Sequence, residues 1–241
     1  MPEFLEVIAI IPARGGSKRL PGKNLVPLAG SPLISHTIRH AQNARRVAGV
    51  YVSTDHDEIA SVASTMGAEV VRRPAELATD SASSESALLH VLDARRTTGL
   101  LDPDLVVFLQ CTSPIRASDD IDRAVERLLQ TGADSLFSAC RETPFIWRDG
   151  VQGLESVTYD CHNRIRTQNW VPHYRENGSI YVLRPWILQN YKNRLGGKIA
   201  VHEMDFWCSF DLDSPQDFEL INWIAVTMTK DGFFLAMPRD A

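Results

Sequence analysis

The chain has 241 residues, of which 44% are hydrophobic, and a formal net charge of −5 at pH 7. A chain of this length can bury a sizeable core, so we expect a single domain over residues 1–241. The acidic balance argues against a nucleic-acid partner, because electrostatic binding to nucleic acid requires a net basic surface. Any phosphate ligand must therefore meet a local cluster of basic residues.

Neither the cysteines nor the N-terminal residues indicate export or a membrane anchor. The four cysteines lie far apart and form no C-x-x-C pair, which favours free thiols in a reducing compartment over a zinc site or a disulfide framework. The N-terminal apolar run is short and has neither a preceding basic region nor a small-residue cleavage site. We expect a cytoplasmic protein with no membrane partner.

Up to about residue 139, short apolar runs alternate with segments of helical periodicity. The expected strands lie near residues 5–11, 47–54, 68–71 and 104–110. The expected helices lie near residues 31–46, 59–63, 87–92 and 121–129. This alternation predicts an α/β fold, a doubly wound, mainly parallel sheet with helices on both faces, in which ligands bind beyond the carboxyl ends of the strands.

The regular alternation stops after Ala139. Residues 141–175 carry several aromatic residues among charged ones, and we interpret them as a smaller insertion used for dimerisation. An ordinary long insertion packed on its own domain is the alternative. The core resumes with strands near residues 179–185 and 199–204, and a closing helix follows Ser214, where the sequence Ser-Pro-Gln-Asp predicts a cap.

A loop rich in glycine and basic residues, PARGGSKRLPGKN, follows the first expected strand. Two adjacent glycines let backbone amides turn toward an anion. Four positive charges accompany them, at Arg14, Lys18, Arg19 and Lys23. We therefore predict that this loop holds a triphosphate.

Two other phosphate-binding motifs do not fit this loop. A P-loop has four residues between its glycines and a hydroxyl for magnesium, whereas five residues separate Gly16 from Gly22 and Asn24 takes the place of the hydroxyl. The G-x-G-x-x-G fingerprint of dinucleotide-binding folds is absent. The remaining alternative is a solvated basic surface loop.

The opening IIPARGGSKRLPGKN is similar to the signature of the acylneuraminate cytidylyltransferases, also called CMP-sialic acid synthetases. Further similar segments follow in the same order, at residues 52–55, 72–84, 110–116, 176–182 and 210–218. The resemblance implies a fold of the nucleotide-diphospho-sugar transferase type. It also implies that a homodimer joins CMP from CTP to the anomeric hydroxyl of a nine-carbon acidic keto sugar, using Mg²⁺ and releasing pyrophosphate.

The resemblance assigns the nucleotide to residues of two segments. The triphosphate falls to Arg14 and Lys23, with the backbone of Gly15, Gly16 and Ser17 nearby. The base and ribose fall to Arg73, Ala82 and Ser83, and Asn24 is a further candidate contact. A guanidinium offers a planar fork of donors for two phosphate oxygens, whereas a lysine is a mobile point charge. For Arg73 the alternative is an exposed salt-bridging residue before a proline.

Asp211 and Asp213 lie two positions apart in an apparent strand, WCSFDLD. Alternation along a strand sends both carboxylates to one face. Two hard oxygen ligands there suit Mg²⁺, which keeps waters and substrate phosphates in its shell. With Arg14 and Lys23 they form the predicted catalytic set. The alternative is that Asp213 only precedes a helix as a capping neighbour while Asp211 is solvated.

The resemblance assigns the sugar to Gln110, Arg166 and Tyr181, in a region that the family takes partly from the partner subunit. The sugar carboxylate requires a cationic partner, for which Arg164 and Arg166 are the candidates. Tyr181 has an alternative as a core strand residue. Cys111 stands where the family usually has proline, and we expect a small buried side chain rather than a nucleophile.

Three other polar residues receive structural interpretations. His36 and His40 lie four apart on an expected helix, but without a third evident ligand we interpret them as packing or surface residues rather than a metal site. Asp55 ends the second expected strand, and we expect it to cap the following helix, with a contact near the nucleotide as the alternative.

Three alternatives to the implied function stay open. The first is a cytidylyltransferase for pseudaminic, legionaminic or 3-deoxy-octulosonic acid. The second is a hexose-1-phosphate nucleotidyltransferase, whose loop usually carries fewer charges. The most distant is a catalytically silent nucleotide-binding regulator, which has no chemical need for the acidic pair.

Overall fold

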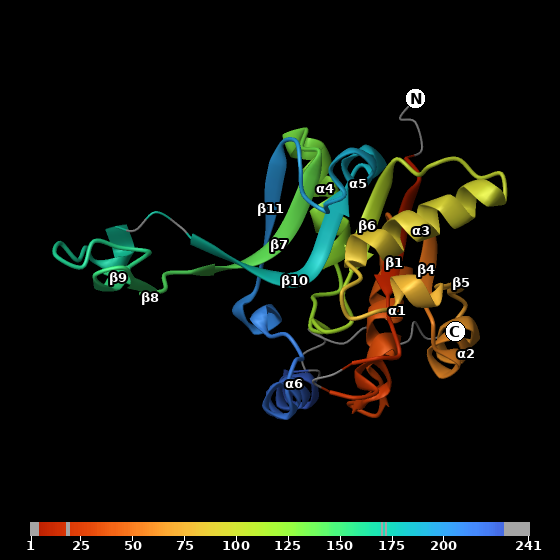
Figure 1. The fold of residues 1–241 in the computed structure, drawn as a ribbon, viewed down its shortest axis with the longest axis horizontal. Coiled ribbons are helices and arrows are strands. Elements are labelled where there is room, and N and C mark those ends of the chain that lie inside the picture. The colour runs from red at the N-terminus through yellow and green to blue at the C-terminus, as the bar shows by residue number, and fades with distance from the viewer. Residues whose placement is uncertain (1–4, 18–19, 170, 172, 229–241) are drawn as a thin grey trace.

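The structure, a computed structural model, describes residues 5–17, 20–169, 171 and 173–228. Its centre is a seven-stranded sheet in the order β11-β7-β10-β6-β1-β4-β5 (Figure 1). The strands are β1 (Val7–Pro12), β4 (Gly49–Thr54), β5 (Glu69–Arg72), β6 (Leu105–Leu109), β7 (Ser135–Glu142), β10 (His173–Leu183) and β11 (Ile199–Met204). All pairings are parallel except those of β10 with β6 and β7. The predicted mainly parallel sheet is therefore confirmed.

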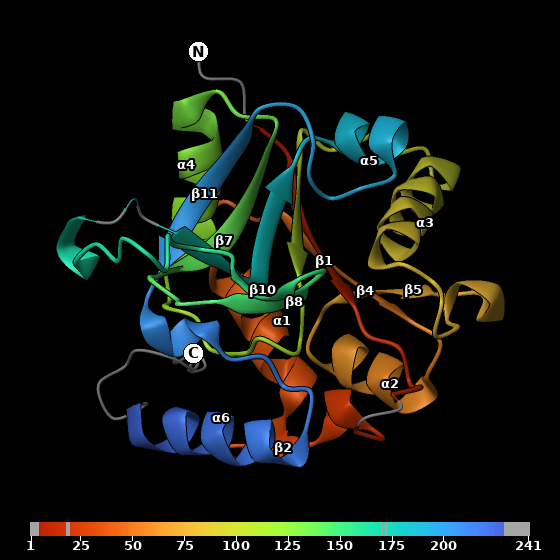
Figure 2. The same cartoon turned by 60° about the vertical axis from the view of Figure 1, so that its left-hand side comes forward.

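Helices cover both faces of the sheet. Side chains of β1 alternate between the faces, so each face carries a hydrophobic core that helices must cover. Val7, Ala9 and Ile11 belong to one hydrophobic cluster, while Ile8 and Ile10 belong to the other. The helices are α1 (Leu33–Asn43), α2 (Asp57–Thr65), α3 (Ser84–Thr97), α4 (Asp120–Thr131), α5 (Pro185–Tyr191) and α6 (Pro215–Met228). The second cluster packs α3 and α5, which lie side by side in Figure 2, and the first packs the other helices.

None of the helices in the described ranges is both long enough and apolar enough to cross a lipid bilayer.

The carboxyl ends of β1, β4 and β6 lie at one edge of the sheet. The strand register pairs Pro12 of β1 with Ser53 of β4 and Ile10 with Phe108 of β6, so the segments that leave these strands start next to one another. The antiparallel β10 crosses the same edge and has a register shift between Glu176 and Tyr181. Four segments of the chain therefore meet where ligands bind in sheets of this kind.

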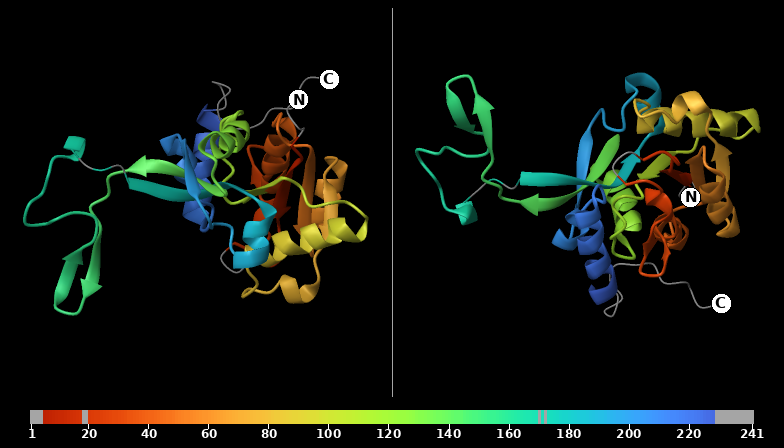
Figure 3. Two further views of the ribbon diagram at one scale, coloured as in Figure 1. Left: turned by 90° about the horizontal axis from the view of Figure 1, so that it is seen from above. Right: turned by 60° about the horizontal axis from the view of Figure 1, so that its bottom comes forward.

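Residues 143–169 and 171, here called the projecting segment, lie between β7 and β10 in the chain and extend away from the sheet (Figure 3). The described part contains the paired strands β8 (Trp147–Gly150) and β9 (Gly153–Ser156) and the 3₁₀ turn η3 (Thr167–Asn169). The ring of Tyr159 makes edge contacts with Phe145 and Trp147 at 4.9 and 5.9 Å between centroids. Several apolar side chains stay exposed, namely Ile146, Val151, Leu154, Val157 and Ile165. This arrangement differs from an insertion packed on its own domain.

The two-core arrangement predicts the effect of truncating α3. Leu92 is fully buried in the second cluster, whereas Leu101, beyond the end of α3, is 83% exposed. We expect Leu92→Ala to lower the free energy of unfolding by about 2–5 kcal/mol, since it removes buried methyl groups and leaves a cavity. Leu101→Ala is the matched control and should change stability by less than about 0.5 kcal/mol. Urea unfolding followed by circular dichroism measures both, and equal effects would contradict the assigned burial of α3.

Candidate active site

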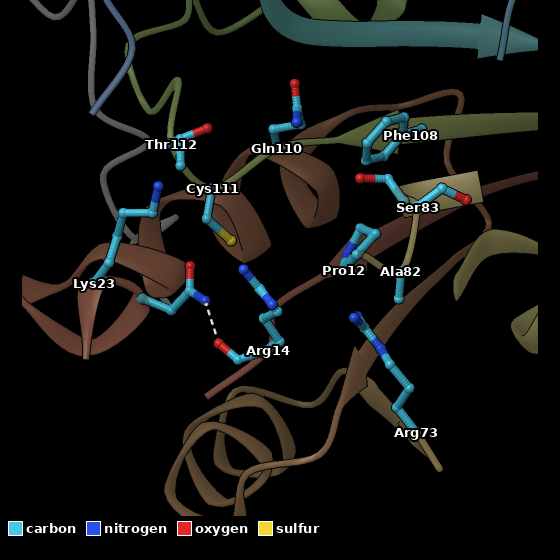
Figure 4. Close-up of a pocket in the computed structure, with 12 residues that line it drawn as sticks. Pro12, Arg14, Lys23, Arg73, Ala82, Ser83, Phe108, Gln110, Cys111 and Thr112 are labelled. Carbon is cyan, nitrogen blue, oxygen red and sulfur yellow. Dashed lines mark hydrogen bonds between the residues drawn. The ribbon is translucent and has the colours of Figure 1, made fainter. Parts of the chain in front are cut away.

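A pocket opens at the carboxyl edge of the sheet and brings together residues from distant parts of the chain (Figure 4). Its lining residues are Pro12, Arg14, Lys23, Asn24, Arg73, Ala82, Ser83, Ser84, Phe108, Gln110, Cys111 and Thr112. Arg14 and Arg73 lie across the pocket from Gln110 in Figure 4. The set includes most residues that the sequence assigned to the nucleotide, and we call it the first pocket.

The glycine-rich loop is held against the end of β4. The Gly15 N–H donates to Oδ1 of Asp55 at 2.9 Å, and the Asn24 amide donates to the Arg14 carbonyl at 3.0 Å. A Cβ atom on Gly15 would lie 2.5 Å from the His56 ring, so only glycine fits there. Gly16 and Ser17 belong to the same loop without lining the pocket. Lys18 and Arg19 lie outside the described residues.

The expectation that Asp55 caps α2 is wrong. The residue before α2 is His56, and no side chain caps that helix. Asp55 instead restrains the glycine-rich loop through the Gly15 amide. A capping preference describes a residue next to a helix in sequence, and here a longer-range main-chain donor competes for the same carboxylate.

The two arginines of the first pocket differ in burial. The Arg14 guanidinium is partly exposed and pairs with Asp80 at 2.9 Å. Arg73 is only 9% exposed, and its guanidinium donates to Oγ and to the carbonyl of Ser53 at 3.1 and 2.6 Å. Burial lowers the pKa of Arg73, yet a guanidinium stays protonated in proteins. The alternative of an exposed salt-bridging residue is therefore wrong for Arg73.

The loop between β5 and α3 supplies the remaining wall. Ser83 caps α3, since its Oγ accepts the Ser86 N–H at 3.2 Å. Ala82 precedes it in the pocket lining. The N-terminus of α3 therefore opens beside the pocket and presents the positive end of its dipole there.

Lys23 joins the glycine-rich loop to the segment that holds the acidic pair, far away in the sequence. It is the first residue of the 3₁₀ turn η1 (Lys23–Leu25). Its Nζ donates to the Leu212 carbonyl at 3.0 Å and contacts Oδ1 of Asp213 at 3.3 Å. The basic loop and the acidic pair therefore belong to one site.

The prediction that Asp211 and Asp213 lie in a strand is wrong. The 3₁₀ turn η4 (Phe206–Ser209) ends before Asp211, and the pair occupies an irregular segment before α6. Leu212 between them is fully buried, while Asp211 is exposed and Asp213 is partly exposed. Both carboxylates therefore face away from the core, although the strand expected from the pattern is absent.

A cap fixes the start of α6 next to the pair. The Asp217 carboxylate accepts the N–H groups of Asp213 and Ser214 at 3.1 and 2.7 Å, and the Ser214 hydroxyl accepts the Asp217 N–H at 3.2 Å. These reciprocal bonds form the capping box predicted from Ser-Pro-Gln-Asp.

The acidic pair fits a magnesium ion that shares its shell with a substrate. In the described ranges no group of three or more His, Cys, Asp or Glu side chains forms a closed metal site. Two exposed carboxylates beside a cationic pocket match the few protein ligands that Mg²⁺ takes when phosphates supply the rest. His36 and His40 are both buried in α1, and Nε2 of His36 lies 2.8 Å from the Leu28 carbonyl.

A second pocket adjoins the first at Gln110. Its lining residues are Arg175, Glu176, Asn177, Gly178, Tyr181, Ser209, Phe210, Asp211 and Asp217. A Cβ atom on Gly178 would lie 2.8 Å from Oε1 of Gln110, which places the Gln110 side chain against Gly178. Gly178 has a φ of +68°, so glycine is favoured there on conformational grounds as well.

Tyr181 is a core strand residue, as the alternative interpretation of the sequence expected, and it also borders a pocket. It is 3% exposed and its ring stacks on Phe108 at 5.3 Å, as a core residue does. It also lines the second pocket, and its hydroxyl donates to the Glu176 carboxylate. Burial, reinforced by Glu176, raises the pKa of Tyr181, so this hydroxyl stays protonated.

Arg166 does not line either pocket in the structure of the single chain. It lies in the projecting segment. Arg164, two residues earlier, places its guanidinium 3.8 Å above the Phe145 ring. The cationic residue in the second pocket lining is Arg175, which pairs with Glu142 at 2.8 Å.

Residues 8–222 match the sequence profile of a family described as Cytidylyltransferase. The chain belongs to the cytidylyltransferase family. It is 37% identical to the N-acylneuraminate cytidylyltransferase of Oncorhynchus mykiss over 222 residues, which are 90% of this chain and 49% of that protein. It is 30% identical to the pseudaminic acid cytidylyltransferase of Campylobacter jejuni subsp. jejuni serotype O:2, covering 88% of this chain and 93% of that one.

The chain thus spans about half the length of the N-acylneuraminate cytidylyltransferases of fishes that it matches. A solved structure of CMP:2-keto-3-deoxy-manno-octonic acid synthetase with CTP superposes with a TM-score of 0.69 at 19% identity, covering 94% of this chain and 99% of that one. At this identity the likeness shows that the two share the cytidylyltransferase fold.

Sequence reasoning missed the buried polar residues behind the site. Arg116 is fully buried and donates to Thr37 and to the carbonyls of Gln110 and Ser179, at 3.3, 2.8 and 3.1 Å. Burial lowers the pKa of Arg116 to about 10. The signal that the sequence offered was the place of Arg116 in the same family-like segment as Gln110, residues 110–116. A guanidinium buried among apolar residues needs several hydrogen-bond acceptors.

Cys111 is a buried side chain at 3% exposure, as expected, and burial raises the pKa of its thiol to about 12. Cys140 and Cys208 are also buried, whereas Cys161 is exposed. A thiol with a raised pKa stays protonated at mildly alkaline pH and reacts slowly.

We expect iodoacetamide to alkylate Cys161 alone in the native protein and all four cysteines in urea, as read by peptide mass spectrometry. Rapid native alkylation of Cys111 would support a nucleophilic role for it.

Proposed function

We propose that the protein transfers CMP from CTP to the anomeric hydroxyl of a nine-carbon acidic keto sugar, N-acylneuraminate or a close analogue, and releases pyrophosphate. The contact of Lys23 with Leu212 and Asp213 carries the proposal, because it joins the basic loop and the acidic pair at one pocket. The similarity to the N-acylneuraminate cytidylyltransferase of Oncorhynchus mykiss and the match to the family support the same reaction.

The cations of the first pocket would bind and neutralise the triphosphate. Arg14 is partly exposed and can direct its fork of donors to two phosphate oxygens. Lys23, near the end of the glycine-rich loop, contacts Asp213. Its ammonium can follow the charge that develops on pyrophosphate as it leaves. The buried Arg73, held by Ser53, would contact the nucleoside beside Ala82 and Ser83.

Asp211 and Asp213 are the residues that would hold Mg²⁺. When bound, the ion would polarise phosphate oxygens and help lower the pKa of the attacking hydroxyl. Asp213 itself would hold the Lys23 ammonium in position for the triphosphate. In-line attack on the α-phosphorus requires the sugar on the side opposite the leaving pyrophosphate, and the second pocket, which begins at Gln110, is the space we propose for it.

The sugar would lie in the second pocket with Gln110 and Tyr181. Its carboxylate requires a cation, and Arg175 is already paired with Glu142. We propose that Arg166 of a partner subunit supplies this charge within a homodimer, because the projecting segment carries exposed apolar side chains and its own Arg166 lines neither pocket.

The identity of the acid is the open alternative within this proposal. Relatives carry the names of N-acylneuraminate and pseudaminic acid cytidylyltransferases. Legionaminic and 3-deoxy-octulosonic acids share the carboxylate and the anomeric hydroxyl that the proposed site requires. A cytoplasmic location is also proposed, since all four cysteines are free, as is usual in a reducing compartment.

The proposal is tested by pyrophosphate release from CTP with a panel of these acids and Mg²⁺. We expect release with at least one of them and loss of rate by more than about a hundredfold in Asp211→Ala, because an electrostatic stabiliser of the transition state is removed. Asp93→Ala, an exposed carboxylate change on α3, is the matched control and should leave the rate unchanged. Absence of release with every acid would favour the catalytically silent regulator, and release with glucose 1-phosphate in their place would favour the hexose-1-phosphate enzyme.

A subunit-complementation experiment tests the proposed dimer. Arg166→Ala and Asp211→Ala chains would be co-expressed with different affinity tags and purified through both, so that only hybrid dimers remain. We expect the hybrids to regain about half of the wild-type activity, because one of the two sites then has both residues intact. Hybrids as inactive as the two parent variants would place Arg166 in its own chain's site, and an Arg166→Ala parent with wild-type activity would place it outside any site. Hybrids that cannot be isolated, together with a monomeric mass by light scattering, would contradict the dimer itself.

A further inference from the structure

A buried hydroxyl stands directly behind the acidic pair. Ser113, in the segment after β6, is 1% exposed, and its Oγ lies 3.1 Å from Oδ1 of Asp211 and 2.9 Å from the carbonyl of Asn177. A serine hydroxyl has one proton to donate, and neither an ionised carboxylate nor a carbonyl can donate back to it. Hydrogen bonds to charged acceptors are the stronger kind, so Asp211 competes well for that proton.

The main chain next to Asp211 is already fixed by other groups. The Leu212 N–H donates to the Thr112 carbonyl at 2.8 Å, and the Leu212 carbonyl accepts from Lys23 at 3.0 Å. These bonds place the peptide but leave the exposed carboxylate of Asp211 free to rotate. Within the described ranges, Ser113 is the hydrogen-bond partner of that carboxylate.

The position of Ser113 is itself fixed by its neighbours. Asn177 is anchored on both sides, since its Oδ1 accepts from Ser138 at 2.6 Å and its Nδ2 donates to the Cys208 carbonyl at 3.0 Å. A Cβ atom on Gly178 would approach Oγ of Ser113 to 3.3 Å. Ser113 therefore has one tightly bounded site, which faces Asp211.

We propose that Ser113 is a positioning residue for the transfer reaction, whose hydroxyl holds Oδ1 of Asp211 and leaves Oδ2 as the oxygen available to a divalent cation. This inference rests on the proposed function, because that proposal gives Asp211 its role. Outer hydrogen-bond partners of this kind change metal affinity or activity by about 10- to 100-fold when they are removed.

The test compares Ser113→Ala with Ser135→Ala. Ser135 is a fully buried serine in β7 whose hydroxyl donates to the Gly196 carbonyl at 2.7 Å and accepts the Gly196 N–H at 3.0 Å, so its loss removes two hydrogen bonds away from the site. Calorimetry would measure the affinity of each variant for CTP in EDTA and in Mg²⁺, without sugar. The ratio of the two affinities reports the cation alone, and thermal unfolding reports stability.

We expect Ser113→Ala to lower this Mg²⁺-dependent ratio by about 10-fold or more while CTP affinity in EDTA is unchanged. Its turnover should fall at low Mg²⁺ and recover partly as Mg²⁺ rises, and it should add little to the loss in Asp211→Ala, since the two residues act as a pair. Ser135→Ala should lower the unfolding temperature without changing the ratio.

Two results would overturn the inference. The first is a Ser113→Ala protein with the wild-type ratio, which would leave Ser113 only a structural role. The second is a wild-type enzyme in which Mg²⁺ does not change CTP affinity, which would remove the cation that Asp211 is proposed to hold. Either result would leave the proposed transfer reaction standing if the wild type releases pyrophosphate from CTP and an acidic sugar, so the two failures are distinguishable.

Discussion

The site depends on the contact that Lys23 makes with the segment before α6. Two carboxylates beside the pocket proposed for the triphosphate would repel that anionic substrate, and the lysine ammonium offsets the repulsion at 3.3 Å from Asp213. The same group donates to the Leu212 carbonyl, so it also fixes the backbone between the two acids. One partly buried cation thereby sets both the charge of the site and the distance between two segments that are remote in sequence.

A second constraint is the cost of the polar groups buried behind the pockets. Arg116 and Asn177 are nearly inaccessible to water, and burial of such groups is unfavourable unless they are hydrogen-bonded. Their bonds run to the turn after β6, to β7, to β10 and to η4. Because each bond ends on main chain or on a buried hydroxyl, displacing any one of these segments would strand a donor. The irregular segments around the site are therefore as constrained as the strands.

The fold could be predicted from the sequence because apolar strands and amphipathic helices are each recognised from a short stretch of residues. Strand β1 is an example, since its side chains are apolar on both faces. The grouping of Arg14, Lys23 and Asn24 at one pocket could be predicted because the three residues share one short loop. Asp211 and Asp213 were placed in a strand that does not form, since the alternation of exposed and buried residues is also met by an extended segment after a 3₁₀ turn. Ser113 and Arg116 lacked such a local pattern, because most of their hydrogen-bond partners lie tens of residues away in the sequence.

The two pockets differ in charge, and this difference links the proposed cation to the proposed dimer. The first pocket is lined by Arg14, Lys23 and Arg73, with no acidic residue among its described lining. The second is lined by Glu176, Asp211 and Asp217 against Arg175, which is itself paired. An acidic sugar would meet net repulsion in the second pocket of a single chain. Binding there requires positive charge from outside the chain, and a cation on Asp211 together with a basic side chain from a partner's projecting segment would supply it.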